Sequence, residues 1–211
     1  MLHIGIPFVV MLALGQTAPD TEAKLEAAFA KSIQYEKQLN YDEARKSLQV
    51  LGAAQQENYF VQVRLGWLAY RNGKYPEAQV SYEAAVRLSP KSTEAKLGLV
   101  LTVLAQGRWA EAEGLAKQVL QTDPQNYFAN LRLAYALRMQ SKFAQAEEIG
   151  EQLMEAYPAD VSVLLELGLT KVGQNEKEAA AKMFQRVLLV DPENVIANQQ
   201  LGRGSVKKKA G

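Results

Sequence analysis

Residues 65–90 read LGWLAYRNGKYPEAQVSYEAAVRLSP, and this stretch decides the fold. Two segments of helical length lie on either side of Gly73, and the second segment ends before Pro90. Glycine tolerates the backbone conformation of a tight turn, and proline stops a helix. The stretch therefore predicts two helices joined by a short turn.

The same pattern recurs every 34 residues along the chain. Three sets of residues carry this period, and each set has a different physical role. They are Pro90, Pro124, Pro158 and Pro192; Ala44, Ala78, Ala112, Ala146 and Ala180; and Leu65, Leu99, Leu133, Leu167 and Leu201. The prolines end helices, and the alanines allow two helices to approach closely. Because one helix pair cannot bury its apolar face alone, the repeat predicts a stack of such pairs.

A fourth set marks where the first helix of each pair begins. It consists of Asn58, Ser92, Asn126, Asp160 and Asn194. Short polar side chains of this kind accept hydrogen bonds from unpaired N–H groups at a helix start. We expect first helices over 59–72, 93–106, 127–140 and 161–174, and second helices over 75–88, 109–122, 143–156 and 177–190. Gly73, Gly107, Ser141 and Asn175 fall in the turns between them.

At these residues the chain resembles the tetratricopeptide repeat family. The motif is carried by Leu65-Gly66, Tyr70, Gly73, Tyr75, Glu77-Ala78, Tyr82, Ala85 and Pro90. The resemblance implies an all-α, right-handed α-α superhelix of about ten antiparallel helices, plus a C-terminal capping helix. It also implies that the first helices line a concave groove, which in this family binds an extended peptide or a partner helix. Ala116 and Gly150 stand where the family has bulky residues, which predicts looser packing in the second helices that carry them.

The period divides the chain into segments. The repeat array is predicted over 25–194, as copies at 25–58, 59–92, 93–126, 127–160 and 161–194, of which the first is degenerate. A linker is predicted over 16–24, and a capping helix and basic tail over 195–211.

Residues 2–14, LHIGIPFVVMLAL, form an apolar run without a charged side chain. The run is shorter than the roughly 20 residues of a membrane span, and it has the length of a signal-peptide hydrophobic region. We expect residues 1–15 to be a signal peptide and the protein to be exported, to a bacterial periplasm. The alternatives are a membrane anchor formed by residues 2–14 and a cytoplasmic protein.

The amino-acid composition excludes several kinds of catalytic and metal-binding site. The 211 residues include no cysteine and one histidine, and the net charge is +1. Thiolate chemistry, cysteine zinc sites and histidine-based catalysis therefore have no basis in this sequence. The balanced charge argues against nucleic-acid binding. We expect no enzyme activity, no metal and no cofactor.

The near-neutral total conceals a segregation of charge. The five first-helix segments hold 8 basic and 4 acidic residues, whereas the remaining segments of the array hold 11 basic and 17 acidic residues. The candidate groove combines arginines with apolar and aromatic side chains. Its predicted residues are Phe60, Val63, Arg64, Trp67, Tyr70, Arg71, Leu101, Leu104, Phe128, Arg132, Tyr135 and Arg138. For the leucines the alternative is core packing between pairs, and for each arginine it is a solvated side chain paired with a nearby glutamate.

Arginine presents paired donors to carboxylates, and aromatic anchors dominate interface energetics. The sequence therefore predicts a non-catalytic module that binds an acidic and partly hydrophobic segment of another protein, as an exported adaptor or assembly factor. The alternative function is a structural scaffold that self-associates.

Overall fold

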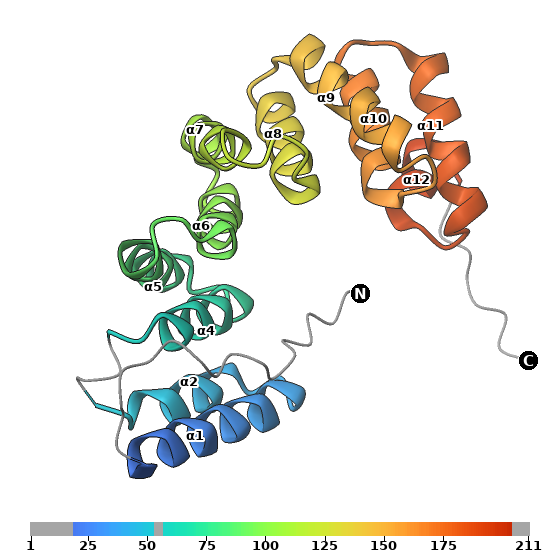
Figure 1. Cartoon of the computed structure of the whole chain (residues 1–211). Helices are drawn as coiled ribbons and strands as arrows, with labels where there is room; N and C mark the ends of the chain where they lie inside the picture. Colours follow the sequence, from blue (N-terminus) through green and yellow to red (C-terminus); the bar gives the residue numbers. More distant parts are fainter. Residues whose placement is uncertain (1–18, 53–56, 204–211) are drawn as a thin grey trace, which may run out of the picture. The chain divides into compact units, whose positions relative to one another are not determined.

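The computed structural model describes residues 19–52 and 57–203. The chain divides into two compact units, Met1–Glu57 and Asn58–Gly211, which are taken separately below. The described residues form eleven helices, labelled as in Figure 1. The predicted all-α superhelical repeat fold is confirmed.

The first unit contains α1 (Pro19–Lys37) packed against α2 (Tyr41–Gln49). α1 begins six residues before the predicted array, so the linker predicted over 16–24 is helical from Pro19 onward. Proline is well suited to a first helical position, and Glu22 places negative charge near the helix start. These local preferences explain the earlier beginning of the helix. The signal-like run at 2–14 lies outside the described residues.

The second unit contains four helix pairs and a short terminal helix. The pairs are α4 (Tyr59–Arg71) with α5 (Tyr75–Leu88), α6 (Thr93–Ala105) with α7 (Trp109–Leu120), α8 (Tyr127–Met139) with α9 (Phe143–Ala156), and α10 (Val161–Gly173) with α11 (Lys177–Val190). The terminal helix is α12 (Val195–Gln200), which packs on α11. The predicted helix ranges differ from the observed ones by at most two residues at either end.

All five predicted N-caps are present. Asn58 Oδ1 accepts hydrogen bonds from the N–H groups of Phe60 and Val61, at 3.0 and 3.2 Å. Ser92, Asn126, Asp160 and Asn194 cap α6, α8, α10 and α12 in the same way. Each cap satisfies N–H groups that have no partner within their own helix, and so fixes where each first helix begins.

The turn within each pair requires one residue with positive φ. Gly73 and Gly107 have φ of 71° and 74°, and Ser141 and Asn175 have 59° and 64°. The residues predicted for these turns therefore adopt the left-handed conformation. In the first unit the equivalent position is Leu39, at 58°, where a bulky side chain is strained.

The alanines of the repeat are buried, as the close approach of paired helices requires. Ala44, Ala78, Ala112, Ala146 and Ala180 are each at most 3% exposed. The predicted loose packing is wrong at Gly150. A Cβ added to Gly150 would lie 2.6 Å from Leu167 Cδ2, so Leu167 of α10 fills the space that a bulky residue would have occupied.

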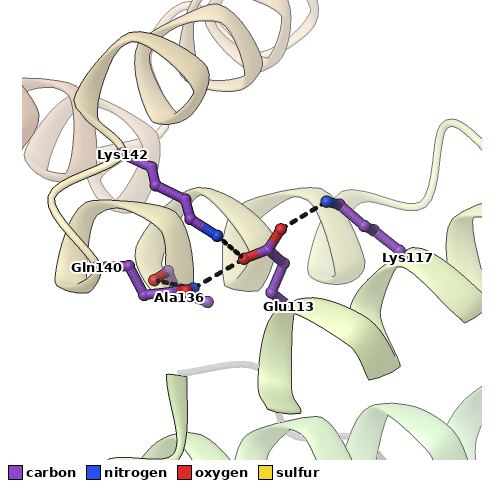
Figure 2. Close-up of polar contacts among 5 residues, drawn as sticks. All are labelled: Glu113, Lys117, Ala136, Gln140 and Lys142. Atoms are coloured by element: carbon purple, nitrogen blue, oxygen red, sulfur yellow. Dashed lines mark hydrogen bonds and ion pairs between the residues drawn. The ribbon is translucent and has the colours of Figure 1, made fainter. Parts of the chain in front are cut away.

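Polar side-chain contacts join each helix pair to the next one, at equivalent positions of the repeat. Figure 2 shows them at Glu113 of α7, whose Oε2 accepts from Lys142 Nζ at 2.7 Å and from Gln140 Nε2 at 2.9 Å. Its Oε1 accepts from Lys117 Nζ of its own helix, at 2.5 Å. Residues 34 positions away repeat the bridge: Gln79 accepts from Gln106 and Arg108, and Glu147 from Gln174 and Lys171. Glu147 of α9 therefore joins the pair α8–α9 to the pair α10–α11.

Replacing either of two glycines in the second helices with alanine should change the free energy of unfolding, in opposite directions at the two positions. Gly150→Ala forces a methyl group against the buried Leu167 and should lower the free energy of unfolding by roughly 1–3 kcal/mol. Gly114 of α7 has nothing within 4 Å of an added Cβ, so Gly114→Ala should raise it by about 0.5–1 kcal/mol. Urea unfolding followed by circular dichroism measures both. Shifts of the same sign would contradict the packing described at Gly150.

The bridge at Glu113 should make stability depend on pH in the acid range. Its hydrogen bond from Lys117, then that from Lys142, lowers the pKa of Glu113 from 4.5 to about 2. Since the folded pKa is the lower one, the stabilisation is complete above pH 4.5 and is lost as pH falls toward 2. The stability difference between the wild type and Glu113→Gln should therefore shrink over that range. Glu148→Gln, at an exposed position of α9, is the matched control and should show no such trend.

Candidate functional site

The first helices of the second unit form a continuous row. α4 contacts α6, α6 contacts α8, and α8 contacts α10. In the described part of this unit the second helices do not approach one another as closely. This closer spacing is the arrangement expected if the first helices line a concave side, which the family resemblance implies.

We define the first-helix surface by residues at equivalent repeat positions on α4, α6, α8 and α10. Each is half-buried or exposed. The members are Phe60, Val63, Trp67, Tyr70, Leu97, Leu101, Phe128, Leu131, Tyr135, Leu165, Leu169 and Val172. Side chains of this kind bury part of their area within the fold and offer the rest to a ligand.

An aromatic group occupies the α4 part of this surface. The rings of Trp67 and Tyr70 stack with centroids 6.1 Å apart, and Tyr75 lies 5.7 Å from Tyr70. The guanidinium of Arg71, which is exposed, lies 5.3 Å from the Trp67 ring centroid. Arg64 on the same helix is half-buried. Arg64, Trp67, Tyr70 and Arg71 thus share one helix with the predicted groove residues Phe60 and Val63, and the Trp67 ring contacts both Tyr70 and Arg71.

Arg132 of α8 is a half-buried cation. Its Nη1 donates to the backbone carbonyl of Leu97 on α6, at 2.7 Å, and its Cζ lies 5.6 Å from the Phe128 ring centroid. Burial lowers the pKa of this guanidinium, and nearby Tyr70 and Tyr82 oppose the shift. Among the described residues no carboxylate lies within ion-pair distance of Arg132. The cation therefore retains N–H groups that an external anion could use.

Arg138 lies about one and a half helical turns further along α8 and differs from Arg132 in having a carboxylate partner. Its Nε and Nη2 donate to the two carboxylate oxygens of Glu166 on α10, at 2.6 and 3.2 Å. The side chains are 15% and 9% exposed, and the guanidinium lies 5.0 Å from the Tyr135 ring centroid. Burial raises the pKa of Glu166, and Arg138 opposes that shift. Arg138 was predicted in the groove, but its charge is already compensated within the fold.

The remaining predicted residues separate into surface and core. Phe128 is 40% exposed, and Phe60, Val63, Leu101 and Tyr135 are half-buried. Leu104 is 7% exposed and belongs to a buried cluster with Val100 and Leu137, so its predicted place in the groove is wrong and it packs in the core. Glu166 was not among the predicted site residues, because the period alone does not show which helix faces reach each other across α8 and α10.

Within the described ranges, no cluster of three or more histidine, cysteine, aspartate or glutamate residues has the arrangement needed to hold a metal ion. No helix there combines the length and the apolar character needed to span a membrane.

Comparison with known proteins identifies the class. Residues 63–127 and 101–161 match the family model described as tetratricopeptide repeat. Together with the helical-pair fold and its 34-residue period, this match identifies residues 63–161 as tetratricopeptide repeats, a fold typical of protein-interaction modules.

Solved structures share this fold at low sequence identity. PilW, described as a widely conserved type IV pilus biogenesis factor, is 19% identical over 89% of this chain and 89% of its own, with a TM-score of 0.73. A portion of MamA from Desulfovibrio magneticus RS-1 is 22% identical over 68% of this chain and 81% of its own, with a TM-score of 0.62. YrrB, described as having an unusual peptide-binding site, is 14% identical over 86% of this chain and 94% of its own, with a TM-score of 0.66. A comparison with curated protein sequences finds no match.

The pair formed by Arg138 and Glu166 should be strongly coupled. Arg138→Met alone leaves a buried carboxylate without its cation and should cost roughly 3 kcal/mol of stability. Arg138→Met combined with Glu166→Leu removes both charges and should recover most of that loss. A double-mutant cycle in urea measures the coupling. Additive effects, each below about 1 kcal/mol, would instead indicate a solvated surface pair.

Proposed function

We propose that the first-helix surface binds a peptide segment or helix of another protein and that the chain acts without catalysis. The observation that carries this proposal is Arg132, a partly desolvated cation that hydrogen-bonds a backbone carbonyl and has no carboxylate partner in the described part of the chain. Arg138 is its internal comparison, because the fold itself supplies a carboxylate there.

A carboxylate of the partner would accept hydrogen bonds from the Arg132 guanidinium and balance its charge. Hydrogen bonds between a guanidinium and a carboxylate are short, directional and stronger than neutral ones. Phe128 and Tyr70 lie near this charge, and Trp67 stacks on Tyr70. Rigid aromatic residues of this kind dominate binding energy in interfaces. The surface therefore suits an acidic and partly hydrophobic segment.

We further propose that the protein is exported and serves as an adaptor or assembly factor. The apolar run at 2–14 supports export. The likeness in fold to PilW, a biogenesis factor, and to YrrB, which has a peptide-binding site, is consistent with a role in binding and assembly.

Co-purification tests this function directly. The tagged full-length protein is isolated from its native cell, and fractionation together with the mass of its N-terminus reports on export. We expect a partner protein to be recovered. Recovery of the intact chain alone, at every salt concentration tested, would contradict the proposal.

Substitutions then test the surface. Arg64→Glu with Arg132→Glu should weaken partner recovery while helicity by circular dichroism stays unchanged. Arg132→Gln, which keeps a donor for the Leu97 carbonyl but removes the charge, should weaken binding by about tenfold or more. The charge-matched control is Lys177→Glu with Lys182→Glu, at exposed positions of α11. Equal losses from the control would show that total charge, and not this surface, governs binding.

A further inference from the structure

We propose that the ion pair between Arg138 and Glu166 is a pH-sensitive switch, and that mild acid adds Arg138 to Arg132 as a second cation for an anionic ligand. This inference rests on the proposed function, because it concerns the regulation of the same surface. The titrating group is the carboxyl group of Glu166 on α10. When that group is protonated it is neutral, and the charge of Arg138 is no longer balanced within the fold.

The pair joins two first helices and leaves Glu166 with a single cation. Arg138 on α8 donates to both carboxylate oxygens of Glu166, at 2.6 and 3.2 Å, and the Glu166 side chain is 9% exposed. In the described part of the chain, Arg138 is the one charged group that pairs with Glu166. A carboxylate that is removed from water with few donors takes up a proton more readily than one with many.

The other charged groups on the helices packed against α10 do not pair with Glu166. α10 packs on α8, α9 and α11. On α8, Arg132 donates to the Leu97 carbonyl, and on α11, Arg186 donates to the Pro158 carbonyl. Glu147 of α9 and Glu176 both pair with Lys171 of α10. The remaining charged side chains of α9 and α11 are exposed: Glu148, Glu151, Glu155, Lys177, Glu178 and Lys182.

Glu166 differs in this respect from the glutamates that join helix pairs. Burial raises the pKa of Glu166 above its ordinary value of 4.5, and the hydrogen bond and charge of Arg138 oppose the shift. Glu113 accepts from two lysines and a glutamine, and Glu147 from a lysine and a glutamine. Those hydrogen bonds lower the pKa of both carboxyl groups.

A pH window therefore lies between 4.5 and the raised pKa of Glu166. Within it Glu166 takes up a proton, while Glu113 and Glu147 keep the charges that hold the pairs together. Because the folded pKa of Glu166 is the higher one, its protonation favours the folded state relative to neutral pH. Acid in this window thus changes the charge of the surface without loosening the stack.

Both arginines lie against aromatic members of the first-helix surface. Arg132 is 5.6 Å from the Phe128 ring centroid, and Arg138 is 5.0 Å from that of Tyr135. The Nη1 group of Arg138 lies 3.6 Å from the sulfur of Met139, a weak acceptor on a side chain that is 38% exposed. This N–H group is the part of the guanidinium that an external anion can approach.

The spacing of the two cations defines the ligand that responds to the switch. Six residues separate them on α8, a rise of about 9 Å along the helix axis. Arg132 extends toward α6 and Arg138 toward α10, so their guanidinium groups diverge. An extended peptide covers about 3.3 Å per residue, so its two anionic groups must lie about three or more residues apart. A ligand with one anionic group uses Arg132 alone and does not respond.

Synthetic peptides test the switch with the full chain. Their anionic groups are the sulfonates of cysteic acid, which stay ionised throughout the titration, so that only the protein changes its charge. One probe carries a single sulfonate, and the other carries two, separated by a short or a long spacer of glycine and serine. Between neutral pH and about pH 5, the two-sulfonate probe with one of these spacers should gain about tenfold in affinity over the single-sulfonate probe, by fluorescence anisotropy.

Variants assign this gain to the pair. Glu166→Gln stands in for the protonated state, so it should bind the two-sulfonate probe tightly at neutral pH and gain nothing more in acid. Adding Arg138→Met to Glu166→Gln should abolish the gain at every pH and leave binding of the single-sulfonate probe unchanged. Glu148→Gln, at an exposed position of α9, removes the same charge and should keep the pH dependence of the wild type.

A titration without ligand separates the switch from the proposed function. In the wild type, NMR of side-chain carboxyl carbons follows Glu166, and the Arg138 Nε–H signal should move with the same midpoint. A midpoint at or below pH 4.5, or no gain at neutral pH from Glu166→Gln, would overturn the switch and leave the proposed function standing. If binding of the single-sulfonate probe ignores Arg132→Gln, the proposed function is wrong, and the titration still decides whether Glu166 titrates as inferred.

Discussion

The close approach of two helices at a buried alanine is the contact on which the rest of the second unit depends. Ala78, Ala112, Ala146 and Ala180 are almost fully buried where paired helices touch. A larger side chain there would separate the helices and uncover the apolar faces that stack on the next pair. Stacking in turn aligns the first helices into one row. The candidate binding surface on the first helices therefore depends on small residues that lie on the second helices.

The chemical character of that surface depends on which charged side chains already have a partner of opposite charge within the fold. Arg132 and Arg138 lie on one helix, yet only Arg138 meets an internal carboxylate. Glu113 and Glu147 likewise form ion pairs with Lys142 and Lys171, which join successive helix pairs. Arg132 thus stays a localised cation beside the Phe128 ring, with no carboxylate partner in the described part of the chain. Composition alone, which is nearly neutral, conceals this arrangement.

The local features of the fold could be predicted from sequence because each depends on residues near one another in the chain. Asn58 caps the helix that directly follows it, and Gly73 sets the turn at its own position. Contacts between pairs could not be predicted in the same way. The Arg138–Glu166 pair and the Leu167 side chain over Gly150 depend on how two helices face each other across the stack. Several groove residues were correctly placed on first helices, but only the structure separates Arg132, with no internal carboxylate, from Arg138, which has one.

The most direct test of the account is chemical-shift mapping of the full-length protein with its co-purified partner segment. The largest changes should fall on α4, α6, α8 and α10, with the Arg132 side-chain signals among them. The second helices α5, α7, α9 and α11 should change little. Largest changes on the second helices, or an unaffected Arg132, would contradict the claim that the first-helix surface is the binding site.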